Sequence, residues 1–406
     1  MNDRFLQRRR LLRSALAGVG TGAFAPIVAP SIFSTMAHAA PADDDRILVV
    51  LELSGGNDGL NTVVPYADDM YYRHRPTIGI PGAKLRKLDD HFGLNPGMAG
   101  FERLWKDGKL AIVHGCGYEN PSFSHFTSMA YWHTAAPNSG DDYGWYGRLA
   151  DVMAPKPRPN FLVNIDTTQS LAVKSRVHTP VVFDDPNKFL RNAFQQERSL
   201  LDADDHAAAA SGNRRFLDDV ARSARESSEL VRDAWARYKS PVDYGINPLG
   251  LNKVAACISA GLPTKLYYVA YRNNAFDTHV QQADLHQRLL TYAADAVLGF
   301  QRDLERLGQA DRVSLMAFSE FGRRVPENTS LGTDHGSANV MFFSGASVRG
   351  GHYGKSPDLG ALDAGDNLVH TTDFRRVYAT AIDGWLKLGA APKILKGTFD
   401  PFPVFG

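Results

Sequence analysis

The chain has 406 residues, of which 44% are hydrophobic and 22% charged, so it can bury a large core and is not a disordered chain. Its formal net charge is +1, but the first 39 residues contribute +4, which leaves −3 for the remainder. A mildly acidic protein without long basic runs is not expected to have nucleic acid as its main partner. Two cysteines exclude a disulfide-rich scaffold and a cysteine-ligated metal, and most simply they are small buried residues.

The N-terminal segment has the pattern of a twin-arginine (Tat) export signal. Arg8 and Arg9 fit the order R-R-x-apolar-apolar-basic, and Ala37-His38-Ala39 fits an A-x-A cleavage site. We therefore expect residues 1–39 to be removed after passage through the Tat translocase. Residues 40–406 are then periplasmic or extracellular. No segment of this mature chain is long and apolar enough to predict a transmembrane span.

Short apolar runs alternate with helical patterns along the rest of the chain. The runs are apolar throughout, as expected for strands covered on both faces, and they span residues 47–51, 110–113, 161–163, 181–183, 266–270, 313–318 and 340–343. A long helix is predicted before the run at 313–318, where apolar residues recur every three or four positions from Leu285 to Leu307. This alternation predicts an α/β fold with a mostly parallel central sheet between helical layers.

Residues 186–260 have a different pattern from the rest of the chain. Phe216, Val220, Val231 and Trp235 follow helical spacing, with charged residues between them. We expect this segment to be an inserted helical cap.

Polar side chains of the metal-ligand type lie next to several predicted strands. They are Asn57, Asp58, Ser122, Ser124, His125, Asp277, His279 and Glu320, which follow strands, and His335, which precedes the last one. Each alone is more simply a turn, cap or structural residue, but parallel strands would bring these ends together at one edge of the sheet. Carboxylates with imidazoles suit Zn²⁺ or Mn²⁺, and all-oxygen sets suit Mg²⁺ or Ca²⁺. The pattern predicts one or two divalent metal ions.

The stretch "NPSFSHF" places Ser124 at the N-cap of a predicted helix. Two roles stay open for this hydroxyl: it caps the helix, or it is a nucleophile for a phosphoryl or sulfuryl centre. Ser122 is a second candidate nucleophile. Arg323 and Arg324 either bind an anionic ester group or pair with nearby acids.

The order of these elements resembles the alkaline phosphatase and sulfatase superfamily. More closely, the chain is similar to the exported family called domain of unknown function 1501. The residues that carry this similarity are "SGGNDGLNTVVPY", "SHF", "GWYGR", "FDTH", "SEFGR", "GTDHG" and "TDFRRVYA", together with the export signal. The resemblance implies a three-layer alkaline-phosphatase-like sandwich over residues 40–406, with the helical insertion near 186–260.

The resemblance also implies two metal subsites. Asp58, Ser124 and Glu320 correspond to one subsite, and Asp277, His279 and His335 correspond to the other. Glu320-Phe321 stands where the superfamily has Asp-His, so an imidazole is missing, and His125 is an alternative source of it. His286 is a reserve ligand for the second subsite, and Asp334 is expected to orient His335 or to cap its turn.

These features predict an exported metal-dependent hydrolase of phosphate or sulfate esters, with a small or polymeric anionic ester as its substrate. Ser124 would be the nucleophile. The alternative is a relative that has lost its chemistry and acts as a periplasmic binding or assembly factor. The departure at Glu320-Phe321 is the feature that favours this alternative.

Overall fold

The computed structural model describes residues 45–189 and 226–406. The predicted export signal and residues 190–225 of the predicted insertion lie outside the described residues, so they stay predictions. Within the two described ranges, no helix has the length and apolar character needed to cross a bilayer.

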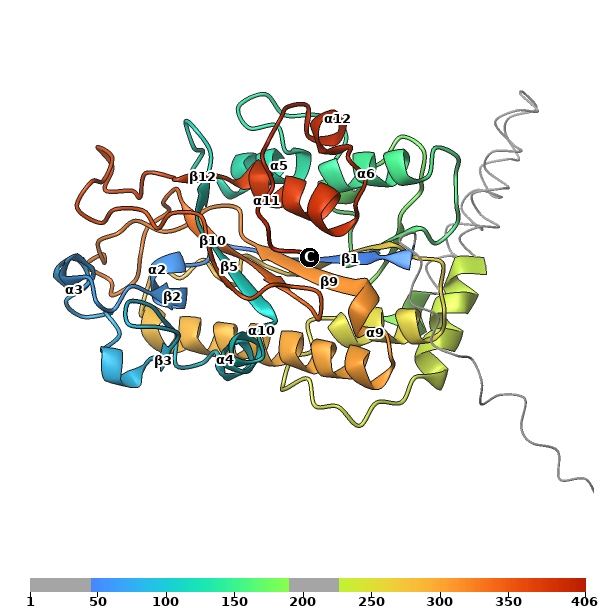
Figure 1. The fold of residues 1–406 in the computed structure, drawn as a ribbon, viewed down its shortest axis with the longest axis horizontal. Helices are drawn as coiled ribbons and strands as arrows, with labels where there is room; N and C mark the ends of the chain where they lie inside the picture. The colour runs from blue at the N-terminus through green and yellow to red at the C-terminus, as the bar shows by residue number, and fades with distance from the viewer. Residues whose placement is uncertain (1–44, 190–225) are drawn as a thin grey trace, which may run out of the picture. The chain divides into compact units, whose positions relative to one another are not determined.

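A nine-stranded sheet forms the centre of the described part of the chain (Figure 1). The order is β11-β5-β10-β9-β1-β8-β6-β7, and β12 also pairs with β5. The strands are β1 Ile47–Leu53, β5 Leu110–Gly117, β6 Leu162–Ile165, β7 Val181–Phe183, β8 Leu266–Tyr271, β9 Val313–Phe318, β10 Asn339–Ser344, β11 Gly351–Tyr353 and β12 Thr372–Asp373. Each of the seven predicted apolar runs overlaps a strand of this sheet, although β6 begins one residue after the predicted start at Phe161.

The sheet is mostly parallel, as predicted. β10 runs antiparallel to its two neighbours, β5 and β9, and the other pairings are parallel. The carboxyl ends of β1, β5, β8 and β9 therefore meet at the edge where β10 begins. This edge is where an open α/β sheet places its functional residues.

Helices cover both faces of the sheet, which explains why its strands are apolar throughout (Figure 1). On β1, Ile47, Val49 and Leu51 belong to one core, and Leu48 and Val50 belong to the other. The first core is closed by α4 Ala99–Lys106, α9 Leu251–Ser259 and α10 Gln282–Arg306. The second core is closed by α5 His125–Thr134, α6 Trp145–Met153, α11 Phe374–Ala379 and α12 Ala391–Leu395.

The end of the predicted insertion belongs to the main domain. Residues 226–237 are helical, and α9 is packed into the first core. The segment between them is tied to α10, because the hydroxyls of Tyr238, Ser240 and Tyr244 donate to Asp303.

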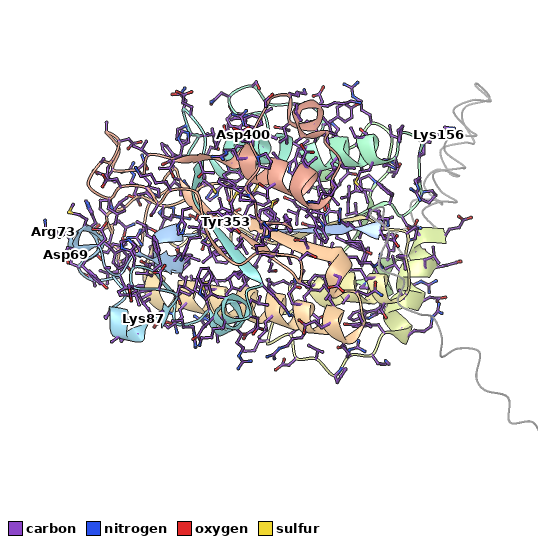
Figure 2. The ribbon with its side chains drawn as sticks, in the orientation of Figure 1. Asp69, Arg73, Lys87, Lys156, Tyr353 and Asp400 are labelled. Carbon is purple, nitrogen blue, oxygen red and sulfur yellow. The ribbon has the colours of Figure 1, made fainter. Side chains whose placement is uncertain are left out.

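Smaller elements complete the fold of the described residues. A three-stranded sheet is made by β2 Val63–Val64, β4 Gly93–Leu94 and β3 Arg86–Lys87. The short helices are α2 Gly59–Thr62, α3 Asp69–His74, η2 Gly82–Lys84, η3 Leu171–Val173, η5 Ala310–Arg312 and the π-helical η6 Thr380–Trp385. Both cysteines are free and buried, as the simpler interpretation predicts. Charged side chains such as Asp69, Arg73, Lys87 and Lys156 are exposed (Figure 2).

Candidate metal centre

The loop after β1 contains two glycines with positive φ. Gly55 has a φ of +119° and Gly56 a φ of +74°, and a Cβ on Gly56 would lie only 2.2 Å from the Phe321 ring. The backbone N–H of Gly55 donates to Glu320 Oε1 at 2.8 Å. The "SGGNDG" stretch thus makes a tight turn, and it packs the end of β1 against the end of β9.

Asp58 caps helix α2 and is fully buried. Its Oδ1 accepts from the backbone N–H groups of Leu60 and Asn61 at 3.1 and 3.3 Å. Its Oδ2 accepts from Arg75 at 2.7 Å and from Gln282 at 2.5 Å. Burial opposes ionisation, but the Arg75 guanidinium outweighs it, so the pKa of Asp58 lies below its usual value. Since both oxygens are occupied, the structure does not bring Asp58 into the predicted metal set.

Asp277 follows β8 and lies at the centre of a group of histidines. Its Oδ1 is 2.9 Å from His279 Nε2 and 3.1 Å from His335 Nε2, and its Oδ2 is 3.4 Å from His125 Nε2. We call these four residues the Asp277 cluster. Burial would raise the pKa of Asp277, but Arg323, which donates to Oδ1 at 2.7 Å, outweighs it and the pKa is lowered to about 2. The carboxylate is therefore ionised at neutral pH.

The three histidines of the cluster share one orientation. In each ring, Nδ1 bonds to an oxygen outside the cluster and Nε2 faces Asp277. The Nδ1 partners are Glu320 Oε1 at 2.9 Å for His125, Asp334 Oδ1 at 3.2 Å for His279, and the Phe123 carbonyl at 2.7 Å for His335. With the proton on Nδ1, where each ring has an oxygen acceptor outside the cluster, each Nε2 would present a lone pair to the centre, as a bound metal ion requires.

These donor atoms fit a divalent metal ion. One atom each of His125, Asp277 and His335 lies within 4.8 Å of the other two. His125 Nε2 is buried and has no hydrogen-bond partner among the described residues. The Nε2 atoms of His279 and His335 lie 3.0 Å apart, where two lone pairs would repel each other without a cation or an extra proton. Tetrahedral bonds of about 2.0–2.1 Å place ligand atoms roughly 3.3–3.4 Å apart, close to the spacings around Asp277.

Glu320 supports the cluster from behind. It is fully buried, and its oxygens accept from His125 Nδ1 at 2.9 Å and from Ser319 Oγ at 3.0 Å as well as from the glycine turn. The hydrogen bond that His125 donates to the Glu320 carboxylate raises the pKa of His125 above its ordinary value. Glu320 holds the imidazole that faces the centre, and its role as a metal ligand stays a prediction.

Phe321 occupies the position where the resemblance expects an imidazole. Its ring centre lies 5.0 Å from that of His125 and 4.8 Å from that of His335. Two imidazoles therefore lie beside this position, that of His125 at the start of α5 and that of His335 before β10. The His125 ring is the alternative source of the missing imidazole that the sequence left open.

Arg323 is buried and its donors are used within the protein. They bond to the backbone carbonyls of Gly55, Gly56, Phe276 and Thr333 and to the carboxylate of Asp277. Of the two roles that the sequence left open for Arg323, these contacts agree with pairing to an acid, Asp277, rather than with binding an ester group. Arg324 is exposed.

The two predicted serine nucleophiles lie at the start of α5. Ser124 is exposed and caps the helix, with its Oγ 3.5 Å from the N–H of Thr127. Ser122 Oγ accepts from the N–H of Ser124 at 3.3 Å. Ser124 is the direct chain neighbour of His125, so the cap places its hydroxyl on the same helix end as a cluster side chain.

Two contacts of the cluster were not predicted from the sequence. The first is that of His125 with Glu320 and Asp277. His125 was predicted only as a substitute ligand, because spacing along the chain does not say which helix end meets which strand. Asp334 bonds to His279 and not to His335, so its predicted partner is corrected. His286, the reserve ligand, is not part of the Asp277 cluster. It is buried beside the Asp58 network, and its Nε2 lies 2.9 Å from Asn57 Oδ1.

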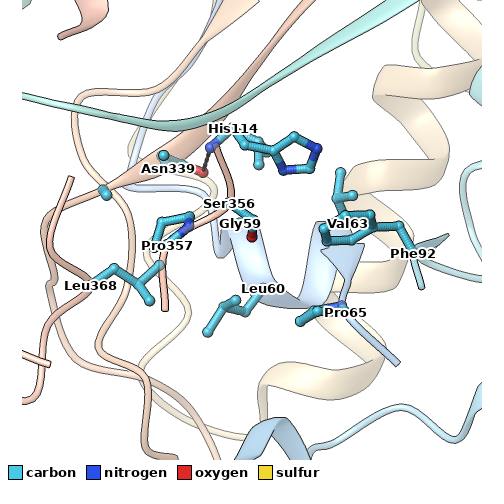
Figure 3. A pocket seen from close by; sticks show the side chains of 13 residues that line it. Gly59, Leu60, Val63, Pro65, Phe92, His114, Asn339, Ser356, Pro357 and Leu368 are labelled. Carbon is cyan, nitrogen blue, oxygen red and sulfur yellow. Dashed lines mark hydrogen bonds between the residues drawn. The ribbon is translucent and has the colours of Figure 1, made fainter. Parts of the chain in front are cut away.

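A small cavity lies elsewhere, between β5 and the loops near β10 (Figure 3). It offers about 20 Å³ to water, roughly the room for one molecule. His114 lines it beside Phe92, Val63 and Pro357, and its lining contains none of the residues of the Asp277 cluster. This cavity is too small for an ester substrate.

The chain belongs to the family described as "Protein of unknown function (DUF1501)", whose model matches residues 45–383. The family predicted from the sequence motifs is therefore confirmed. A search of curated proteins finds no match.

Solved structures with a similar backbone include sulfatase-like proteins. The PsFucS1 sulfatase from Pseudoalteromonas sp. is 12% identical, with a TM-score of 0.37 over 88% of this chain and 70% of that one. The C-terminal periplasmic domain of EcEptC from Escherichia coli, in complex with Zn, is 10% identical, with a TM-score of 0.35 over 74% and 73%. Ps i-CgsB in complex with k-i-k-neocarrahexaose is 11% identical, with a TM-score of 0.34 over 87% and 73%. Similarity this low says nothing about the substrate of the present chain.

Proposed function

We propose that this protein is an exported, metal-dependent hydrolase of phosphate or sulfate esters. One observation carries the proposal: three imidazole Nε2 atoms and an ionised carboxylate converge at the carboxyl edge of the sheet. Histidine and carboxylate donors favour Zn²⁺ or Mn²⁺ over Mg²⁺ or Ca²⁺, which prefer all-oxygen sites. His125, Asp277 and His335 would hold the ion, with His279 as a further donor.

A bound divalent ion would supply positive charge to the transferring phosphoryl or sulfuryl group. The protein supplies the rest of the site. Glu320 and Asp334 hold two of the imidazoles in place, and Arg323 holds Asp277. The cluster side chains are 18–38% exposed, so an ester can reach them from solvent.

Ser124 is the proposed nucleophile. Its hydroxyl is exposed at the N-terminus of a ten-residue helix, where backbone N–H groups favour negative charge. Attack by Oγ on the phosphorus or sulfur would form a seryl ester and release the alcohol of the substrate, which takes up the hydroxyl proton. Water would then cleave the seryl ester and restore the serine.

The location of this activity rests on the N-terminal sequence. Arg8-Arg9 and the Ala37-His38-Ala39 site support export by the Tat translocase and a periplasmic or extracellular enzyme. That pathway carries folded proteins, which agrees with a metal bound before export. The proposed substrate is a small or polymeric anionic ester.

The proposal is tested by metal analysis of the purified protein, together with turnover of nitrophenyl phosphate, phosphodiester and sulfate. We expect about one or two equivalents of metal and measurable hydrolysis of at least one ester. Asp277→Ala should lose both. The matched control is Asp166→Ala, which removes another strand-end aspartate paired with an arginine, Arg272 at 2.9 Å. A protein that has no metal and no turnover, and that Asp277→Ala does not change, would contradict the hydrolase. A stable partner that co-purifies with the protein and still binds Ser124→Ala and Asp277→Ala would favour the binding or assembly factor.

The role of Ser124 is tested separately. Incubation with substrate and rapid acid quench should add the mass of one phosphoryl or sulfuryl group to the wild type. Ser124→Ala should prevent this addition, whereas Ser122→Ala should retain it. A wild type that turns over without any covalent adduct, and a fully active Ser124→Ala variant, would show that water attacks directly.

A further inference from the structure

Three exposed apolar residues belong to the chain segments that carry the Asp277 cluster. The large hydrophobic residues that are exposed in the described part of the chain are Phe123, Phe126, Leu230, Ile246, Val280, Leu285 and Val369. Three of them, Phe123, Phe126 and Val280, are next to cluster residues in the chain or bonded to them. We call these three residues the apolar rim.

Each residue of the apolar rim is tied to the cluster by the backbone. Phe126 directly follows His125 in the first turn of α5 and is 91% exposed. Val280 directly follows His279 and is 60% exposed. Phe123 is 38% exposed, and its carbonyl holds His335 at 2.7 Å.

Burying an exposed phenyl or isopropyl group against an apolar partner is favourable, because it removes apolar surface from water. Exposed apolar side chains on the segments of a polar site therefore suit the apolar part of a ligand. The fold does not require these side chains for its core: Phe126 packs into neither sheet core. The side chains of the Asp277 cluster are themselves partly exposed, and Phe126 and Val280 each adjoin one of them in the chain. This adjacency is what would let one molecule contact the ionic centre and the apolar rim together.

We propose that the substrate is an amphiphilic ester, in which a phosphate or sulfate group meets the Asp277 cluster and an alkyl or aryl alcohol group lies against the apolar rim. This inference rests on the proposed function. Phe126 and Val280 then determine specificity: they favour esters of apolar alcohols over esters of small ones. They take no part in the chemistry.

The test compares binding of ethyl phosphate and octyl phosphate, each below its micelle concentration, to the metal-loaded protein by calorimetry. We expect octyl phosphate to bind about tenfold more tightly or better, since burying part of a phenyl ring and an alkyl chain accounts for at least that factor. Phe126→Ser, with or without Val280→Ser, should narrow this gap to less than about threefold. Leu230→Ser is the control, because it removes an exposed leucine on the helix of residues 226–237, and it should keep the gap.

The outcomes separate this inference from the proposed function. If octyl and ethyl phosphate bind equally, or if neither binds, the apolar rim does not select the alcohol group. If Leu230→Ser removes the difference in affinity between octyl and ethyl phosphate as Phe126→Ser does, the octyl chain binds unspecifically. This result would also overturn the inference about the apolar rim. A gap that depends on Phe126 in a protein that hydrolyses none of the tested esters would support the apolar rim and contradict the hydrolase. Retained melting temperatures show that the exposed substitutions leave the fold intact.

Discussion

Two aspartates follow neighbouring strands of the sheet, and each is paired with a buried arginine. Asp58, after β1, bonds to Arg75, and Asp277, after β8, bonds to Arg323. Both aspartates were predicted from the sequence to be metal ligands. In the structure the oxygens of Asp58 are filled by fixed protein donors, whereas Asp277 faces three imidazole nitrogens.

The difference shows that the role of a strand-end carboxylate depends on the groups that surround it and not on its position after a strand. Asp58 is fully buried and holds helix α2 and the loop at Arg75 together. The side chain of Asp277 is 30% exposed and faces the Nε2 atoms of imidazoles whose Nδ1 atoms are fixed by hydrogen bonds to other residues. We therefore expect loss of Asp58 to affect folding and loss of Asp277 to affect metal binding.

The largest effect is expected for Asp58→Ala. This change leaves the buried Arg75 without its carboxylate, and breaking a buried ion pair costs about 3–5 kcal/mol. Denaturant unfolding of the variant should show a loss of this size. A change below about 1 kcal/mol would contradict the structural role of Asp58.

The next effect is expected for Asp277→Asn. The amide keeps an oxygen for Arg323 but removes the charge at the centre, so metal affinity should fall by more than about a hundredfold. Competition with a chromogenic chelator measures this affinity. The free energy of unfolding, measured without metal, should change much less than in Asp58→Ala. If Asp277→Asn instead lost stability and Asp58→Ala lost metal affinity, the roles assigned to the two aspartates would be wrong.

A smaller effect is expected for Glu320→Gln. Glutamine keeps an acceptor for His125 Nδ1 but loses the negative charge, and such outer partners contribute about 10–100-fold to metal affinity. The same chelator competition should show a loss in this range. Unchanged affinity would mean that His125 is not a ligand. A loss as complete as in Asp277→Asn would mean that Glu320 binds the metal itself.

A further effect concerns the pH dependence of stability and the buried network around Asp58. Burial lowers the pKa of His286 from 6.5 to about 4. Between these values the unfolded chain binds a proton that the folded protein does not, so the stability should fall as pH drops from about 6.5 to about 4. His286→Gln should reduce this slope in urea unfolding curves measured between these pH values. An unchanged slope would assign the acid sensitivity to other buried groups, such as His114, whose pKa burial lowers to about 3.

Much of the fold could be predicted because its causes are local. Strands covered on both faces must be apolar throughout, and residues 181–183 and 313–318 were predicted at the bounds that the structure has. The antiparallel direction of β10 and the short strands β11 and β12 were not predicted. Their pairing depends on contacts between distant residues, and two or three residues carry no periodic pattern.

The sequence by itself determined the family, the α/β layers and the edge of the sheet where polar residues gather. Asp277, His279 and His335 were among the strand-end candidates that a parallel sheet brings together, and the superfamily resemblance grouped them into one subsite. Only the tertiary structure decided that Glu320 holds His125 and that Asp58 pairs with Arg75. The reason is physical: a carboxylate is a ligand or a support according to which donors surround it in space, and those donors come from segments far apart in the chain.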